Sequence, residues 1–276
     1  MKRVAITGST GLVGSRIMEL LHEKFLFVPL SQPLVDITNK KSVESALSSI
    51  EYDTILHLAA YTDVDKAQYD QNSAHDVNVI GTNNIFSAAQ TQKKPMIYIS
   101  TDFVFDGNRP PYLETSIPQP ISVYGETKYE AEKIVQKNAM IVRISYPYKA
   151  QCLEKKDFVH KIKEQLTHGN TLHMVHDSLI TPTYIDDIAY ALSYLIENYT
   201  PQIFHVVGTH TLSPYDAGLL IARTFGLNKQ LIHPASFASF FQNRAQRPQF
   251  SDMKSAENTF YTMKTFEQGL STFIKD

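Results

Sequence analysis

A glycine-rich loop near the start of the chain constrains the fold more than any other feature of the sequence. It reads Gly8-Ser9-Thr10-Gly11-Leu12-Val13-Gly14, with a β-prone apolar run before it and apolar residues at helical spacing after it. The first glycine permits a tight turn, the second lets the backbone approach a pyrophosphate, and the third lets helix and strand pack closely. Free N–H groups at the start of the helix favour phosphate. Although the spacing is G-x-x-G-x-x-G, this setting favours a dinucleotide site over a merely flexible loop.

Apolar β-prone runs alternate with helical stretches through the first half of the chain. The predicted strands are 4–7, 25–30, 54–58, 96–99 and 140–144, and the predicted helices between them lie around 40–50, 73–92 and 126–138. The strands are nearly continuous apolar runs, which is typical of a sheet covered on both faces. The predicted fold is therefore α/β, a doubly wound parallel sheet of the Rossmann type.

The second half is less regular and is interrupted by prolines. Helices are expected at 157–168, 185–197 and 214–225. The prediction is a dinucleotide-binding domain over 1–148 and a smaller α/β substrate-binding domain over 149–276. The segment near 180–205 is a candidate to return to the first domain.

Composition narrows the class of protein. A net charge of −2 over 276 residues gives no basic excess for nucleic acid or an anionic membrane. No run approaches the roughly 20 apolar residues of a membrane helix, and the N-terminus lacks the pattern of a signal peptide. The single cysteine, Cys152, excludes an intramolecular disulfide, has no evident base partner and fits a reducing compartment. We therefore expect a cytoplasmic protein.

A tyrosine and a lysine four residues apart form the candidate catalytic pair. Tyr124 and Lys128 share one face of a predicted helix. A neighbouring ammonium stabilises a phenolate and lowers the phenol pKa, so the pair can protonate a nascent alkoxide or deprotonate an alcohol near neutral pH. Thr101 and Asp102 follow a predicted strand, where ligands bind in open α/β sheets. A plain turn held by these polar side chains is the simpler alternative.

The end of the second predicted strand bears on the choice of cofactor. Leu30-Ser31-Gln32 stands where a carboxylate usually binds the adenosine ribose of NAD. The missing acid favours NADP, with NAD left open. Asp36, further on, is expected either at the adenine edge or as the N-cap of the next helix.

Taken together, these motifs resemble extended short-chain dehydrogenases/reductases, and within them the dTDP-4-dehydrorhamnose reductase family. The matching stretches are Thr7–Gly14, His57–Ala67, Asn78-Val79-x-Gly81-Thr82, Ser100–Gly107, Val123–Lys128, Pro182-Thr183-Tyr184 and Arg247-Pro248. The resemblance spans nearly the whole chain and is strongest over 1–145.

The resemblance implies an NAD(P)H-dependent reductase of a nucleotide-linked 4-keto sugar. Tyr124 would protonate the keto oxygen, Lys128 would hold the nicotinamide ribose, and Thr101 would hydrogen-bond the oxygen. The implied cofactor site comprises Gly8, Thr10, Gly11, Leu12, Val13, Gly14, Asp36, Ile37, Leu58, Ala59, Ala60, Tyr61, Asn78, Ser100, Tyr124 and Lys128. The implied substrate site comprises Thr101, Asp102, Phe103, Tyr146 and Arg247.

The sequence departs from the family pattern around the sugar. Phe103 stands where the family commonly has tyrosine, Tyr146 stands where it has tryptophan, and the loop 149–156 lacks the usual glycines. The cofactor and proton chemistry are thus expected to be intact, with a rewritten sugar pocket.

Other polar clusters predict less. His173 and His176 lie in a predicted strand, where residues three apart face opposite sides, so no metal site is expected. His57 is expected to be a hydrogen-bonded structural histidine. Arg247 is expected to pair with a substrate diphosphate or to lie on the surface. Asp63, Asp65 and Lys66 are either a solvated cluster or a support for the site.

Two other functions stay open on the same scaffold. One is a non-catalytic NADP-binding subunit like the regulatory beta subunit of methionine adenosyltransferase, and the other is a nucleotide-sugar epimerase or dehydratase. A homodimer is a candidate assembly.

Overall fold

A parallel six-stranded sheet forms the centre of the computed structural model, which describes residues 1–150 and 155–274. Its strands, in the order β2-β1-β3-β4-β5-β9, are Phe25–Leu30, Lys2–Thr7, Thr54–His57, Met96–Thr101, Met140–Ile144 and Ile203–His205. All neighbouring pairs run parallel. The predicted fold class is confirmed. The strand order reverses between β1 and β3, so a crevice is expected at the carboxyl ends of these two strands.

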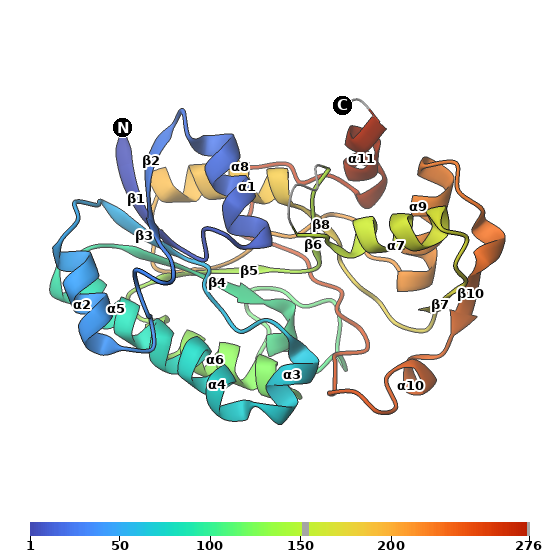
Figure 1. Ribbon diagram of the computed structural model, residues 1–276, viewed down its shortest axis with the longest axis horizontal. Coiled ribbons are helices and arrows are strands. Elements are labelled where there is room, and N and C mark those ends of the chain that lie inside the picture. Colours follow the sequence, from blue (N-terminus) through green and yellow to red (C-terminus); the bar gives the residue numbers. More distant parts are fainter. Residues whose placement is uncertain (151–154, 275–276) are drawn as a thin grey trace.

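Helices cover both faces of this sheet, and the layers are visible in Figure 1. One face carries α1 (Leu12–Leu21) and α8 (Ile185–Glu197), and the other carries α2 (Lys40–Ser48), α5 (Thr82–Thr91) and α6 (Val123–Val135). Successive strand residues point to opposite faces. Accordingly, Val4 and Ile6 of β1 join the core under α1 and α8, and Ala5 joins the opposite core.

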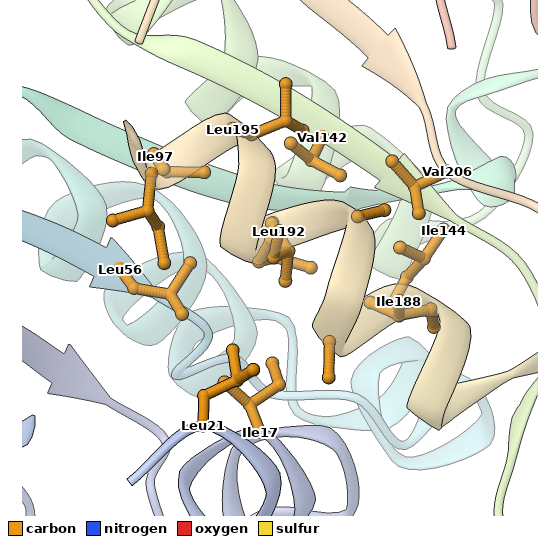
Figure 2. Packing of buried hydrophobic residues seen from close by; sticks show 14 of the residues in the cluster. Ile17, Leu21, Leu56, Ile97, Val142, Ile144, Ile188, Leu192, Leu195 and Val206 are labelled. Atoms are coloured by element: carbon orange, nitrogen blue, oxygen red, sulfur yellow. The ribbon is translucent and has the colours of Figure 1, made fainter. Parts of the chain in front are cut away.

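The core under α1 and α8 is built from branched aliphatic side chains. Figure 2 shows Ile17 of α1 and Leu192 of α8 packed over side chains of β3, β4 and β5, including Leu56 and Val142. These four side chains are fully buried. Each contributes about 1.5–3 kcal/mol through burial, so this layer stabilises the packing of α1 and α8 on the sheet.

A smaller set of elements follows β5. It contains two short parallel pairs, β6 (Pro147–Tyr148) with β8 (Thr183–Tyr184) and β7 (Leu172–Val175) with β10 (Ile232–Ala235). Its helices are α7 (Phe158–Thr167), α9 (Pro214–Thr224), α10 (Phe237–Phe240) and α11 (Phe266–Ser271), with 3₁₀ turns at Lys229–Leu231 and Thr272–Ile274. These elements have apolar clusters of their own, while α8 and β9 pack within the large sheet layer. The domain border near 148 stays a prediction.

The long helix predicted over 73–92 is divided. In its place the chain forms α4 (Gln71–His75), a π-helical turn (Asp76–Gly81) and α5. A separate short helix, α3 (Val64–Tyr69), comes before them. The π-helical turn carries Asn78, whose side chain accepts from the Tyr61 backbone N–H at 2.8 Å and donates to Thr127 Oγ1 at 2.9 Å. Such turns are frequent at functional sites. Apolar spacing alone does not reveal one, because the change of period lasts only one turn.

Candidate active site

The glycine loop joins β1 to α1 in a conformation that requires glycine. Gly8 has φ +68°, and a Cβ atom there would lie 2.8 Å from the backbone nitrogen of Ala59. A Cβ atom on Gly14 would clash with the Gly8 carbonyl oxygen. Gly11 is the N-cap of helix α1. Because glycine has no side chain, no capping hydrogen bond is made to the N–H groups of the first turn of this helix. This arrangement suits a phosphate group.

A cavity of about 810 Å³ opens at the carboxyl ends of β1, β3, β4 and β5. It brings together nearly all the predicted site residues from six separate stretches of chain. They are Gly8, Thr10, Gly11, Leu12, Val13, Gly14, Asp36, Ile37, Leu58, Ala59, Ala60, Tyr61, Ser100, Thr101, Asp102, Phe103, Tyr124, Lys128 and Tyr146.

Two predicted site residues do not line this cavity. Asn78 is buried behind the cavity wall. Its side chain hydrogen-bonds both the N–H and the carbonyl group of Tyr61, and so it supports the backbone of a residue that lines the cavity. Arg247 pairs with Asp65 at 2.8 Å and donates to the Ala245 carbonyl oxygen at 2.7 Å. Asp65 therefore ties the 245–247 segment to α3, which favours a supporting role over a solvated cluster.

The sequence did not single out several other lining residues. They are Val35, Thr38, Thr62, Val64, Val77, Ile99, Ile144, Pro147 and Lys155. Ile99 and Ile144 could have been found by their place at the ends of β4 and β5. Lys155 is the first described residue after 151–154. Cys152 and half of the loop 149–156, which the sequence singled out, lie outside the described residues.

A buried hydrogen-bond chain supports the wall between β1 and β3. Thr7 Oγ1 accepts from the Ala59 backbone N–H at 3.1 Å and lies 2.6 Å from His57 Nδ1. His57 Nε2 lies 3.0 Å from Thr82 Oγ1, and Thr82 Oγ1 donates to the Asn78 carbonyl oxygen. This network fits a neutral imidazole with its proton on Nε2. Burial, aided by the Lys128 charge, lowers the His57 pKa to about 3. These contacts agree with the structural role expected for His57.

Helix α6 carries the candidate proton donor. Ser122 caps the helix by accepting from the Gly125 backbone N–H, and Tyr124 follows in the first turn with 8% of its surface exposed. Burial raises the Tyr124 pKa to about 12, and a hydrogen bond with Thr101 acts in the opposite direction.

Lys128 lies one turn further along α6 and is 3% exposed. Its Nζ donates to the Ile99 carbonyl oxygen at 2.7 Å. Burial lowers the Lys128 pKa to about 7, while the Glu132 charge acts in the opposite direction. The sequence led us to expect a Tyr124 pKa lowered by Lys128. The structure differs because the ammonium bonds to β4 and the phenol is removed from water.

A buried carboxylate joins three segments beside Thr101. Asp102 accepts from Thr101 Oγ1 at 3.0 Å, from Ser145 Oγ at 3.1 Å and from Ser251 Oγ. Burial raises the Asp102 pKa despite these three donors. Ser145 and Ser251 were not predicted. Ser251 lies 149 residues further along the chain, and no local pattern connects it to β4.

Two aromatic side chains shape the cavity beyond Thr101. The Phe103 ring meets Tyr124 edge to face, with centroids 5.4 Å apart. Tyr146 has φ +41°, which is unusual for a residue with a Cβ atom. Its carbonyl oxygen accepts from the Thr183 backbone N–H at 3.1 Å, and its ring meets Phe158. Strained backbone held in this way is common at ligand sites.

The opposite end of the cavity is lined by Ser31 and Gln32 after β2. The Asp36 carboxylate accepts from the Thr38 backbone N–H at 2.9 Å and from its hydroxyl at 2.7 Å. The alternative that Asp36 caps the next helix is wrong, because Asn39 caps α2. Asp36 instead lines the cavity.

A buried hydroxyl in the wall supports a dinucleotide fit. Ser100 is 2% exposed, and its Oγ has no hydrogen-bond partner within residues 1–150 and 155–274. Buried polar atoms are rarely left unpaired in native structures. Together with the glycine loop and the N–H groups of α1, this hydroxyl fits a polar ligand that runs from the loop to Lys128.

The histidines of β7 lie away from this cavity. His173 pairs in register with His233 of β10, with ring centroids 5.6 Å apart. The strand prediction for His176 is wrong, because β7 ends at Val175. Over the described part of the chain, no three His, Cys, Asp or Glu side chains converge as a metal site would require.

None of the described helices is long and apolar enough to cross a membrane.

The comparisons with known proteins find relatives that match nearly the whole chain. The family model described as "RmlD substrate binding domain" matches residues 1–276. A dTDP-4-dehydrorhamnose reductase of Aggregatibacter actinomycetemcomitans is 32% identical over 233 residues, covering 80% of this chain and 78% of the relative. The crystal structure of dTDP-4-dehydrorhamnose reductase from Bacillus anthracis in complex with NADP has a TM-score of 0.93 and 32% identity, covering 100% of this chain and 99% of that one. The beta subunit of rat methionine adenosyltransferase 2 is 28% identical over 264 residues, covering 90% of this chain and 78% of that protein.

Proposed function

The chain belongs to the RmlD substrate binding domain family, and we propose that it is an NADPH-dependent reductase of a nucleotide-linked 4-keto sugar, with dTDP-4-dehydrorhamnose as the first candidate substrate. The carrying observation is the convergence of Thr101, Tyr124 and Lys128 in a cavity that begins at the glycine loop. The relatives named as dTDP-4-dehydrorhamnose reductases support the substrate class. NADH stays an alternative reductant.

The cofactor end is held by backbone and by small side chains. The N–H groups of the first turn of α1 would bind the diphosphate, and Gly8 and Gly14 leave room for it. Ser100 Oγ and Lys128 would bind polar groups of the nicotinamide ribose and its neighbourhood. When bound, NADPH supplies a hydride to the keto carbon.

The proton comes from the protein. Tyr124 would donate its phenolic hydrogen to the keto oxygen as the carbonyl π bond breaks, so carbon gains a hydride and oxygen a proton. Its high pKa keeps the phenol protonated before the step. Thr101 lies between Tyr124 and Asp102 and would orient the same oxygen. Lys128, whose Nζ donates to the Ile99 carbonyl oxygen, would hold the nicotinamide ribose beside this phenol.

The sugar would lie against Phe103 and Tyr146. The Phe103 ring packs against Tyr124 in a T-shaped contact and offers no hydroxyl, while Tyr146 lines the cavity wall. We propose that these two residues select the sugar. Arg247, held by Asp65, would reach a substrate diphosphate only after leaving this ion pair.

Turnover with purified protein tests the proposal. NADPH oxidation is followed with dTDP-4-dehydrorhamnose, with related nucleotide keto-sugars and with no sugar. Sugar-dependent oxidation is expected, with turnover of Tyr124→Phe lower by roughly 100-fold or more and NADPH affinity nearly unchanged. Absence of oxidation with every sugar would reject the reductase. Conversion of sugar without net NADPH consumption would indicate an epimerase or a dehydratase.

A second candidate is a non-catalytic regulatory subunit. The similarity to the beta subunit of rat methionine adenosyltransferase 2 over 90% of this chain favours it. A stable complex with the catalytic methionine adenosyltransferase of the same organism, together with absent keto-sugar reduction, would support this role. Thr101, Tyr124 and Lys128 favour the enzyme, since a purely regulatory subunit needs no proton donor.

Location and assembly complete the proposal. A single cysteine and a net charge of −2 fit a cytoplasmic protein without a nucleic acid partner. A homodimer is the proposed assembly, and light scattering of the purified protein tests it directly.

A further inference from the structure

We propose that Tyr98 is a positioning residue of the active site, the face of its buried ring holding the Lys128 ammonium beneath the cavity. Sequence reasoning predicted no role for Tyr98 beyond its place in a strand. The kinetic consequence rests on the proposed reductase function, whereas the contact itself does not.

The ammonium of Lys128 has an unusual environment for a buried charge. Its Nζ lies 4.1 Å from the centroid of the Tyr98 ring and donates to the Ile99 carbonyl oxygen at 2.7 Å. Within residues 1–150 and 155–274, no carboxylate forms an ion pair with it. The Lys128 ammonium is therefore stabilised on its sheet-facing side by two groups of β4, the Ile99 carbonyl oxygen and the face of the Tyr98 ring. A cation over an aromatic face is most strongly stabilised when water is excluded.

The Tyr98 ring is fixed from several sides. Its side chain is fully buried in β4, and its hydroxyl donates weakly to the Lys128 backbone carbonyl oxygen at 3.4 Å. The His57 ring stacks on it with centroids 5.9 Å apart and an interplanar angle of 25°. His57 is neutral because burial keeps its pKa far below 7. No second cation at His57 therefore competes for the electrons of the ring.

Few other titratable groups face this ammonium. Glu132, one turn further along α6, favours the charged form of Lys128, and His57 senses the Lys128 charge from β3. Tyr124 lies one turn earlier on α6. Burial brings the Lys128 pKa to about 7, so near neutral pH a modest stabilisation decides whether Lys128 is an ammonium. The ring face of Tyr98 supplies such a stabilisation.

A purely steric role for Tyr98 predicts different behaviour. If the ring only filled space, its size would matter and its electron density would not. Fluorination of phenylalanine withdraws electrons from the ring face while changing its size little. A series that begins with Tyr98→Phe and adds fluorine atoms stepwise to that phenylalanine therefore separates the two roles.

The main readout is the protonation of Lys128, which does not need turnover. Protein labelled with ¹³C at the lysine ε-carbon is titrated by NMR, and the Lys128 signal is assigned by its loss in Lys128→Met. We expect the Lys128 pKa in Tyr98→Phe to stay close to that of the wild type. It should then fall stepwise with fluorination, by about one pH unit over the series. The alkaline limb of kcat should move to lower pH in parallel, because less ammonium remains at a given pH.

The same substitutions at Tyr52 provide the matched control. Tyr52 is also a buried tyrosine, 3% exposed, and its hydroxyl has no partner within the described residues. It lies outside the cavity lining and should leave the Lys128 pKa unchanged. Equal melting temperatures across the Tyr98 series would show that the fold is retained.

The outcomes separate the two proposals. A Lys128 pKa that stays constant through the fluorinated series overturns the positioning role, whatever the turnover. A stepwise fall in a protein that reduces no keto-sugar supports the positioning role and rejects the reductase.

Discussion

Removing Glu132 should cost more stability than any exposed charge on the same helix. Arg143 Nε donates to Glu132 Oε1 at 2.9 Å and Arg143 Nη2 donates to Oε2 at 2.6 Å, and both side chains are only 2% exposed. Arg143 also donates to His205 Nε2 at 3.3 Å and lies over the Phe105 ring at 5.1 Å. Glu132→Ala would leave the guanidinium buried without its carboxylate.

The expected magnitude follows from that uncompensated charge. Removing one partner of a buried ion pair costs about 3–5 kcal/mol. For a chain of this size, 1 kcal/mol corresponds to about 2–4 °C, so the melting temperature should fall by roughly 6–20 °C. The pair joins α6 to β5, so the loss acts on the helix that carries Tyr124 and Lys128.

Urea unfolding followed by circular dichroism measures this cost. Glu130→Ala is the matched control, because Glu130 lies on the same helix, is 48% exposed and only approaches His75 at 3.9 Å. Its effect should stay below about 1 kcal/mol. A double variant, Glu132→Leu with Arg143→Met, should recover part of the loss because it removes both charges.

Two results would refute this reasoning. If Glu132→Ala costs no more than Glu130→Ala, the buried pair does not stabilise the fold as its geometry indicates. If the double variant is no more stable than Glu132→Ala, the loss comes from packing and not from an unpaired guanidinium.

Three further perturbations have defined outcomes. Gly14→Ala should abolish NADPH binding measured by fluorescence, because its methyl group would clash with the loop before α1; unchanged affinity would refute the close-approach argument. Ser251→Ala should lower stability by about 1–3 kcal/mol in urea unfolding, because Asp102 loses one of its donors; an unchanged midpoint would contradict this contact. Burial opposes ionisation of Asp106, but hydrogen bonds led by the Tyr112 hydroxyl lower its pKa below the ordinary value. This carboxylate therefore contributes stability above about pH 4 that is lost as pH falls further, and melting curves of Asp106→Asn should show a smaller loss on acidification than the wild type.

The parts predicted correctly from the sequence depend on short stretches of chain. The glycine loop, the strand before it and the helix after it lie within 1–21, and each signal is local. Tyr124 and Lys128 lie one helical turn apart, so their common face follows from the period of the helix. The strand-end position of Thr101 follows from the parallel topology.

The parts that sequence reasoning missed depend on contacts between distant segments. Asp102 meets Ser251 only because the 249–253 segment returns over the end of β4. Arg247 pairs with Asp65 of a distant segment, whereas the sequence led us to expect either a substrate diphosphate as its partner or a place on the surface. The Tyr124 pKa is raised, whereas the sequence predicted that Lys128 would lower it. Burial raises this pKa, and the Lys128 ammonium donates to the Ile99 carbonyl oxygen instead of to the phenol.

This division explains why the reaction class is easier to infer than the sugar. The proposed cofactor end depends on backbone geometry at the ends of β1 and β3, and the proposed proton donor lies on one helix, so few residues would define the chemistry. The proposed sugar end of the cavity is lined by Phe103 after β4, Tyr146 after β5 and Lys155 beyond it. Tyr146 is fixed there by the Thr183 backbone, which belongs to a different part of the chain. Under the proposed function, substrate choice would depend on how the segments after β4 and β5 pack against the segment that holds Thr183. It would change through Phe103 and Tyr146 while Tyr124, Lys128 and the glycine loop stay as they are.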